Sequence, residues 1–140
     1  MKARDIMTKD PRVVTPETPV QEAARLMKSE DTGVLPVVDA ESSRRLVGVI
    51  TDRDIAIRVV GEGMSSAQVR DAMSPSVKSC RPDDAIKDVL QVMSDAQVRR
   101  LPIVDDGGIV VGIVSQADVV READGKKVER TIEAISEPTA

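Results

Sequence analysis

Short apolar runs separated by polar turns are the clearest pattern along this chain. Val34–Val38 and Leu46–Ile50 are nearly continuous apolar runs, and the stretch between them is rich in turn-forming and charged residues. Leu101–Val104 and Ile109–Val114 repeat the pattern around Asp106-Gly107-Gly108. Runs of this length bounded by turn signals are typical of buried strands. We therefore predict two β-hairpins.

Each predicted hairpin is preceded by apolar residues at helical spacing. The first set is Val20, Ala23, Ala24 and Met27, and the second is Ile86, Val89, Leu90 and Met93. Residues three and four apart share one face of a helix, so each set predicts a helix packed on a core. We expect Thr18 as N-cap of the first helix, with Pro19 at its first position. Val13-Val14 is expected to be a short strand, and a further helix is expected at about 52–60 and about 116–123.

An internal duplication connects these elements. The segment Arg4-Asp5-Ile6-Met7-Thr8 recurs as Arg70-Asp71-Ala72-Met73-Ser74, and Gly48-Val49-Ile50-Thr51 recurs as Gly112-Ile113-Val114-Ser115. Neither copy is expected to be stable alone, because a unit of about 60 residues buries too little of its surface. We therefore predict an α/β fold of two tandem β-α-β-β-α repeats about a pseudo-two-fold axis, with sheets that share one core.

The same duplication sets the expected boundaries. We expect the first repeat at 1–62, a linker at 63–66, the second repeat at 67–124 and a C-terminal helical tail at 125–140. The linker prediction rests on its Gly and Ser content, and the tail prediction rests on apolar residues at helical spacing.

Composition narrows the function. The chain has no Phe, Tyr or Trp and a net charge of −4, so it offers neither stacking platforms nor a basic field for nucleic acid. It has no His and one cysteine, Cys80, which excludes Cys/His zinc sites and Ser-His-Asp or Cys-His catalysis. Cys80 is most simply a small residue near a strand end. No apolar run approaches the ~18 residues that span a bilayer, so no membrane partner and a cytoplasmic location are expected.

A hydroxyl residue and an aspartate three positions later follow the last strand of each repeat. They are Thr51 and Asp54 in the first copy, and Ser115 and Asp118 in the second. A strand that turns directly into a helix exposes backbone N–H groups, which attract anions such as phosphate. The same residues also form a helix N-cap with its capping box, which contributes ~1 kcal/mol without any ligand. The residues alone leave both roles open.

With these motifs duplicated in order, the chain resembles a pair of CBS (cystathionine β-synthase) motifs, the so-called Bateman module. The matching segments are Asp5-Ile6-Met7, Leu35-Pro36-Val37-Val38-Asp39 and Gly48–Asp54, with their second-copy equivalents. The length and order are similar to stand-alone bacterial CBS-pair proteins, including those of the hypoxic-response type. The resemblance implies regulatory binding of AMP, ADP, ATP or S-adenosylmethionine in clefts between the two motifs.

The resemblance also implies roles for individual residues. It places Asp54 and Asp118 at the ribose hydroxyls, and Thr51 and Ser115 beside the phosphate. Thr15, which follows the first strand, would line a site in the first copy. The second copy has an arginine at that place, so its contribution there is open.

Basic residues before the proline of the second strand contact phosphate in nucleotide-sensing members of the family. That role would fall on Arg99 and Arg100, whereas the first copy has Gly33 and Val34 there. Arg53 would replace part of the missing charge, so we expect unequal sites. Without a ligand, the two arginines would be solvated or would form weak ion pairs with the acids at 95 and 105–106.

A second hypothesis is a ligand-free module that dimerises and presents a surface to another protein. The resemblance implies a homodimer with an unknown downstream partner. An enzyme is not expected, because no nucleophile has a base within a recognisable motif. We likewise expect no obligatory cofactor and no metal.

Overall fold

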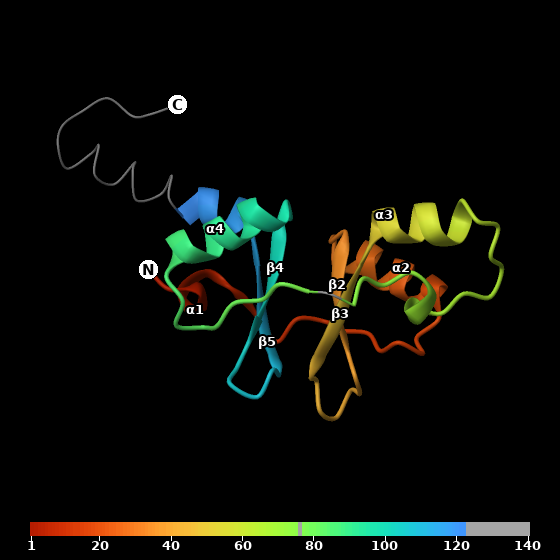
Figure 1. The fold of residues 1–140 in the computed structure, drawn as a ribbon, viewed down its shortest axis with the longest axis horizontal. Helices are drawn as coiled ribbons and strands as arrows, with labels where there is room; N and C mark the ends of the chain where they lie inside the picture. The colour runs from red at the N-terminus through yellow and green to blue at the C-terminus, as the bar shows by residue number, and fades with distance from the viewer. Residues whose placement is uncertain (76, 123–140) are drawn as a thin grey trace.

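Two antiparallel hairpins, one from each repeat, form the centre of the molecule (Figure 1). The computed structural model describes residues 1–75 and 77–122. The first hairpin joins β2 (Val34–Val38) to β3 (Leu46–Thr51), and the second joins β4 (Arg100–Val104) to β5 (Val110–Ser115). Both predicted hairpins are therefore confirmed.

Helices flank the hairpins at the two ends of the view in Figure 1. They are α1 (Ala3–Ile6), α2 (Val20–Ser29), α3 (Asp52–Ile55), which continues as the π-helix η1 (Ala56–Val60), the short 3-10 helix η2 (Val69–Asp71) and α4 (Ile86–Ala96). Residues 116–122 are also helical. Residue 123 and the predicted tail at 125–140 lie outside the described residues. Within those residues, no helix is long and apolar enough to cross a membrane.

The first residues of each repeat pack on the opposite repeat. β1 (Thr8–Lys9) pairs with β5, so β1, β5 and β4 form one sheet, and β2 and β3 form the other. In return, Ser74 pairs with Val49 of β3 through N···O distances of 2.9 and 3.1 Å. In Figure 1 the red N-terminal segment lies beside β4 and β5, although its sequence belongs to the first repeat. Each repeat is therefore completed by the other.

This exchange also satisfies the first backbone donors of the two main helices. The N–H of Val20 in α2 donates to the carbonyl of Ala67 at 3.0 Å. The N–H of Ile86 in α4 donates to the carbonyl of Met1, also at 3.0 Å. The N-terminal N–H groups of a helix need partners from outside the helix, and here distant backbone supplies them.

Two local predictions are corrected by this arrangement. The prediction that Thr18 caps α2 is wrong, because the N-cap is Pro19 and the Oγ1 of Thr18 accepts from the N–H of Thr15. The predicted strand at Val13-Val14 is reduced to one bridge, between Val14 and Val37. At α2 the opposite repeat supplies a bond that the local sequence does not reveal, since the carbonyl of Ala67 accepts from the N–H of Val20, whereas Val14 bonds to Pro36 and Val38 of its own repeat.

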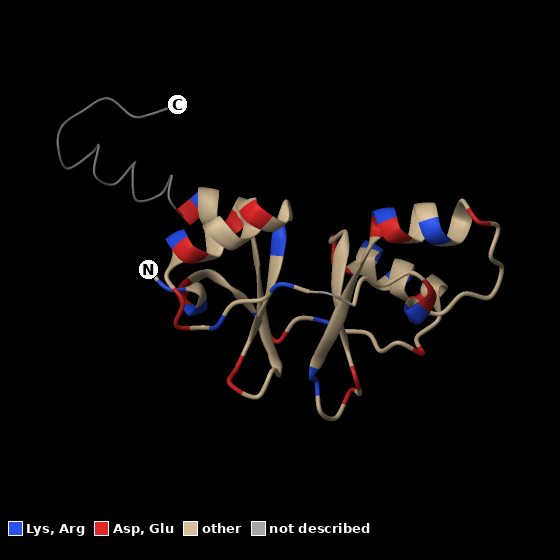
Figure 2. Cartoon of the chain, in the orientation of Figure 1, with Lys and Arg blue, Asp and Glu red and all other residues tan. Residues whose placement is uncertain are grey.

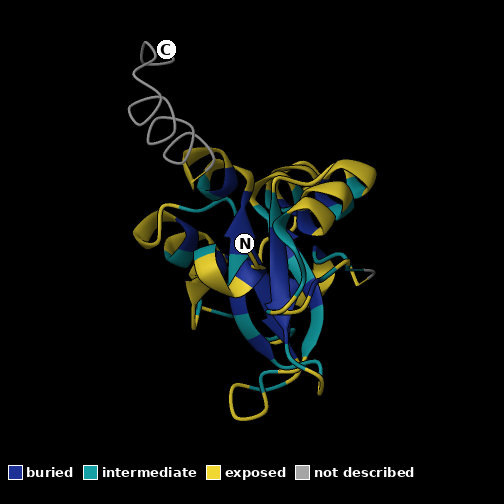
Figure 3. Ribbon diagram, turned by 90° about the vertical axis from the view of Figure 1, so that its left-hand side faces the viewer, coloured by how far each residue is buried: buried dark blue, intermediate teal, exposed yellow. Residues whose placement is uncertain are grey.

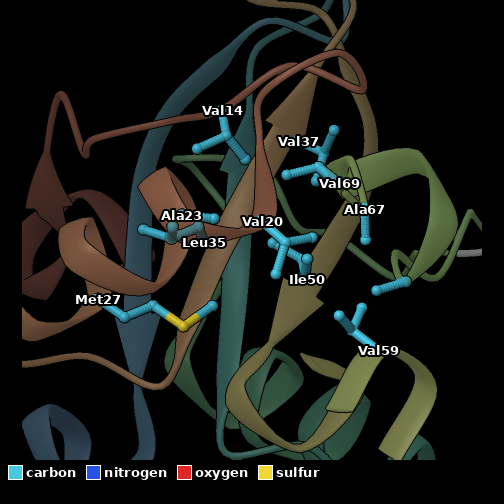
Figure 4. Close-up of a cluster of buried hydrophobic side chains, with 11 residues drawn as sticks. Val14, Val20, Ala23, Met27, Leu35, Val37, Ile50, Val59, Ala67 and Val69 are labelled. Atoms are coloured by element: carbon cyan, nitrogen blue, oxygen red, sulfur yellow. The ribbon is translucent and has the colours of Figure 1, made fainter. Parts of the chain in front are cut away.

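The expected shared core is spread over three clusters of buried side chains, and each contains residues of both repeats. The cluster around α2 includes residues of the 67–72 segment; Figure 4 shows Ala67 and Val69 beside the first hairpin. The cluster around α4 includes residues of the 3–7 segment. A third cluster joins the hairpins through Val38, Val104 and Val110. In Figure 3 the strands are mostly buried, and the outer helix faces are exposed.

Two glycines make the exchange of segments possible. A Cβ added to Gly112 would lie 2.5 Å from the Sδ of Met7, and one added to Gly48 would lie 2.5 Å from the Cε of Met73. Each methionine belongs to the opposite sequence repeat. The glycine within each of β3 and β5 is therefore a packing position for the other repeat.

Candidate functional site

Both Thr/Ser-x-x-Asp segments form capping boxes at the ends of β3 and β5. Thr51 Oγ1 accepts from the N–H of Asp54, and Asp54 Oδ2 accepts from the N–H of Thr51, both at 3.0 Å. Ser115 Oγ accepts from the N–H of Asp118 at 3.0 Å, and Asp118 Oδ2 accepts in return at 3.3 Å. The structural explanation of the motif is correct in both copies. It uses one oxygen of each carboxylate, and the other oxygen of Asp118 lies 3.5 Å from Nη1 of the exposed Arg121 in an ion pair.

Strand pairing places both turns on the same side of the molecule, opposite the hairpin tips (Figure 1). Val34 lies across from Thr51 in one hairpin, and Arg100 lies across from Ser115 in the other. The residues before the first strand of each hairpin therefore meet the residues after its second strand. The sequence alone placed these two groups in separate motifs.

The second repeat brings four predicted site residues together. Arg100 pairs with Ser115 across the strands, and the carbonyl of Arg99 accepts from the N–H of Gln116 at 2.7 Å. Ser115 is buried, Arg100 is half-buried and Arg99 is exposed. Asp118 is hydrogen-bonded to Ser115 in the capping box. We call Arg99 and Arg100 the arginine pair; the start of β4 is blue in Figure 2.

The carboxylates that the sequence offered as ion-pair partners of these arginines have other partners. Asp95 accepts from the side-chain amide of Gln91 at 2.8 Å, Asp105 accepts two N–H groups of its own turn, and Asp106 pairs with Arg81. Within residues 1–75 and 77–122, no ion pair includes the arginine pair. The ion pairs considered from the sequence are therefore absent there. Two adjacent guanidinium groups are available to an anionic ligand.

The first repeat presents an acid at the equivalent place. Gly33 accepts from the N–H of Asp52 at 2.9 Å, and a Cβ added to Gly33 would lie 2.9 Å from the Oδ2 of Asp52. Arg53 is exposed, and its backbone N–H donates to the Oδ1 of Asp52 at 2.8 Å. The carboxylate of Asp52 thus lies where the second repeat carries the arginine pair. The two turns therefore differ in charge, and unequal phosphate binding stays a prediction.

An open pocket of ≈ 390 Å³ lies beside this acid. Its lining residues are Ala24, Met27, Lys28, Asp31, Thr32, Gly33, Asp52 and Ile55. It is formed by α2, the loop after α2 and α3, not by the two repeats together. Thr51, Arg53 and Asp54 are not among the lining residues. One difference in the sequence points to it, namely the small Ala24 where the second repeat has Leu90.

Thr15 is not brought to either turn by any described hydrogen bond. Its Oγ1 lies 3.2 Å from the Oγ1 of Thr18, and its carbonyl accepts from the N–H of Thr18. Val14, the residue before it, pairs with Val37 near the hairpin-tip end of β2. A ligand contact of Thr15 stays a prediction.

Comparison with known proteins identifies the family. The model of the CBS domain matches residues 3–61 and 69–125. This chain belongs to the CBS-domain family. Hypoxic response protein 1 of Mycobacterium tuberculosis is 32% identical over 140 residues, which are 99% of this chain and 96% of that protein. The crystal structure of Hypoxic Response Protein I with two coordinated zinc ions has a TM-score of 0.78 and covers 86% of this chain and 98% of that one. The predicted CBS pair, similar to the hypoxic-response type, is confirmed.

Two similar solved structures contain adenosine compounds. The CBS domain pair of MJ0100, in complex with 5-methylthioadenosine and S-adenosylmethionine, is 30% identical with a TM-score of 0.80 and covers 90% of this chain and 98% of its own. CBSX2 in complex with AMP is 27% identical with a TM-score of 0.76, and the match covers 87% of this chain and 95% of that one. CBS pairs thus bind adenosine ligands, and this fold is in general a regulatory ligand-binding module.

The similar Hypoxic Response Protein I structure holds two zinc ions, and the donors of this chain can be compared with what zinc requires. The chain has no His, and Cys80 is buried. Within the described residues, no three His, Cys, Asp or Glu side chains are grouped to hold a metal ion. Protein zinc sites are built mainly from Cys and His, so the donor set does not fit.

Proposed function

We propose that this CBS pair is a regulatory sensor that binds AMP, ADP, ATP or S-adenosylmethionine in clefts between its two motifs. The observation that carries the proposal is the arginine pair beside Ser115 and Asp118, without a carboxylate partner in the described parts. Guanidinium groups bind phosphate, and a carboxylate accepts from ribose hydroxyls. The adenosine complexes of MJ0100 and CBSX2 support this assignment.

The proposed roles follow the geometry of each turn. In the second repeat, the outer oxygen of Asp118 accepts from the ribose in place of or beside its exposed ion pair with Arg121, and Ser115 lies by the phosphate. In the first repeat, Asp54 and Thr51 take these roles, with Arg53 as the basic residue nearest to them. Thr15 contributes a wall of one cleft.

The signal is transmitted by linkage between the two repeats. One sheet contains a strand of the opposite repeat, and each core cluster contains residues of both repeats, so a ligand between the motifs contacts a jointly built structure. A ligand favours one relative orientation only as far as it binds that orientation more tightly. The altered orientation is then recognised by a downstream protein in the cytoplasm.

The assembly we propose is a homodimer through the outer faces of the helices. Ile57 and Val60 of η1, Leu90 of α4 and Val120 of the 116–122 helix are large apolar side chains exposed to solvent. These helices lie on the upper side of the view in Figure 1. Exposed large apolar side chains favour association with another surface.

The first test removes one carboxylate at a time. We expect Asp118→Ala to weaken AMP binding at its own site about ten-fold, because roughly one charge-assisted hydrogen bond is lost. Asp54→Ala should weaken binding at the other site in the same way. Calorimetric titration of the full chain with AMP, ADP, ATP and S-adenosylmethionine measures both.

Asp71→Ala is the matched control for this test. Its carboxylate accepts from the N–H of Gln68 at 2.8 Å in a capping box of the same kind, outside the candidate site. The control should lose stability but keep affinity. If Asp54→Ala and Asp118→Ala titrate like the parent chain, the residue assignment is wrong.

The second test separates phosphate binding from nucleoside binding. Replacing the arginine pair by alanine should weaken AMP about ten-fold or more, because two charge-assisted contacts are lost, and should leave adenosine nearly unchanged. Titration of both compounds gives the loss of affinity for AMP relative to the loss for adenosine. Equal losses for AMP and adenosine would assign the arginines to packing.

The second candidate function is a ligand-free dimerisation scaffold. Both capping boxes are complete without a ligand, and the described pocket does not lie between the repeats, which favours this alternative. Thermal unfolding distinguishes the two functions. A ligand at ~100 times its dissociation constant adds ~2.7 kcal/mol, which raises Tm by several degrees. A Tm unchanged by all four compounds would support the scaffold.

A further inference from the structure

The exchange of first segments divides the molecule into two structural halves that differ from the sequence repeats. The first half consists of residues 14–74, and the second consists of residues 1–9 and 80–122. The cluster around α2 lies entirely in the first half, and the cluster around α4 lies entirely in the second. Each half therefore has a core of its own and can move as a rigid body.

The two halves meet where their hairpins turn. The N–H of Leu46 donates to the carbonyl of Gly108 at 3.0 Å, and the N–H of Val110 donates to the carbonyl of Arg44 at 2.9 Å. Within residues 1–75 and 77–122, these are the two backbone hydrogen bonds that join one half to the other. Both lie at the hairpin tips on the lower side of Figure 1, opposite the Thr51 and Ser115 turns.

Side chains join the halves at the same end of the hairpins. Among the clusters of the described residues, the one with members from both halves contains Val38, Val104 and Val110. These valines lie at the tip ends of β2, β4 and β5. We call this cluster, together with the two backbone hydrogen bonds, the tip junction.

Arg44 also holds the segment that leads from one half to the other. Its guanidinium donates to the carbonyl of Pro11 at 3.0 Å and lies 3.3 Å from a carboxylate oxygen of Asp10. These two residues directly follow β1 and precede the first half. Backbone and side-chain contacts of Arg44 therefore fix the same end of the molecule.

We propose that the tip junction is a hinge about which the two halves turn. Two bodies with separate cores, joined at one end by a small cluster, move most easily by rotation about that end. Such a rotation changes the distance between the Thr51 and Ser115 turns and leaves the hairpin tips in contact. The hinge needs no ligand, so it goes beyond the proposed function and is tested apart from it.

The test measures distances within the full chain by electron–electron resonance between two nitroxide labels. Lys28→Cys and Ser94→Cys place one label on α2 and one on α4, at exposed positions of different halves. Lys28→Cys with Ser42→Cys is the control pair, because both exposed residues belong to the first half. The parent chain, in which Cys80 is buried, measures background labelling. An excess of unlabelled chain excludes distances between copies.

Two adjacent valines of β2 provide matched variants. Val38 and Val37 are both fully buried, but Val38 belongs to the tip junction and Val37 belongs to the core of the first half. We expect Val38→Ala to widen the distance distribution between the halves about two-fold, because it loosens the hinge. Val37→Ala should lower stability and leave this distribution unchanged.

A surface variant tests the same hinge without a cavity. Arg44→Asn removes the contacts with Pro11 and Asp10, and asparagine tolerates the φ of 55° at this position. It should also widen the distribution between the halves. Arg70→Asn is its control, since it removes an ion pair with Glu17 inside the first half and should change nothing.

The outcomes decide between a hinge and a general loosening of the fold. The proposal is overturned if Val38→Ala leaves the distribution between the halves unchanged, if Val37→Ala widens it equally, or if Val38→Ala widens the control pair as much. If Val38→Ala does not fold, Arg44→Asn decides: widening between the halves that Arg70→Asn does not reproduce supports the hinge, and an unchanged distribution overturns it.

Discussion

Cys80 shows how burial determines the chemistry of a single residue. It belongs to the cluster around α4, where burial raises the pKa of its thiol from the ordinary 9.0 to about 11. The negative charge of Asp84 and a hydrogen bond to it raise the pKa further. The thiolate is the nucleophilic form, so this thiol is unreactive near neutral pH. The interpretation of Cys80 as a small structural residue fits its place in the core.

We expect Cys80 to react with a disulfide reagent at neutral pH only after denaturation. Folding disfavours its thiolate, so stability is independent of this group below about pH 9 and falls as the pH rises from 9 toward 11. Urea unfolding of the parent chain and of Cys80→Ala at pH 7 and pH 10 isolates this contribution. Fast labelling of the native thiol at pH 7 would contradict it.

At the scale of elements, one glycine within each of β3 and β5 packs against a methionine of the other repeat. Met7 lies on Gly112 and Met73 lies on Gly48, so neither glycine can gain a side chain without movement. The duplicated sequence predicted both strand ends. It did not show that each glycine serves the opposite repeat, because the motif that supplies the methionine lies far away in the chain.

Gly112→Ala should lower the free energy of unfolding by about 1–3 kcal/mol through overpacking. Gly48→Ala should cost at least as much, because its Cβ would also lie 2.6 Å from the backbone oxygen of Ser74. Urea unfolding measures both. Gly107→Ala is the control, since its nearest atom, the Oδ1 of Asp105, is 3.4 Å from the added Cβ. A Gly112→Ala protein as stable as this control would show that the contact is not strained.

At the scale of the whole molecule, the exchange of first segments makes the two repeats interdependent. β1 completes the sheet of the second repeat, and the 67–72 segment completes the cluster around α2. The first N–H groups of α2 and α4 also bond to the opposite repeat. A repeat cut at the linker would therefore lose part of its sheet or core together with a helix cap.

We expect neither the fragment 1–66 nor the fragment 67–140 to fold by itself. Each would expose a core cluster that the intact chain buries, and a unit of about 60 residues has little stability to lose. Amide dispersion in NMR spectra of each fragment, with the intact chain as control, tests this. Native-like dispersion for one fragment alone would show that the repeats are independent.

Local patterns in the sequence were sufficient for the two hairpins, for α2 and α4, and for the two Thr/Ser-x-x-Asp capping boxes. Apolar runs predicted the strands, helical spacing predicted α2 and α4, and the Thr/Ser-x-x-Asp spacing predicted where the next helices begin. Such features depend on residues a few positions apart, so a single sequence contains them. The outward positions of Ala24 and Leu90 did not follow, because helical spacing does not say how wide the buried face is.

The sequence by itself determined that this protein is two copies of one α/β unit with a hydroxyl and an acid at each strand end. Only the tertiary structure decided how the copies complete each other and which side chains surround each strand end. It placed the arginine pair beside Ser115 and opened an acidic pocket beside Gly33. The physical reason is that hydrogen bonds and packing between distant segments leave no local periodicity in the chain.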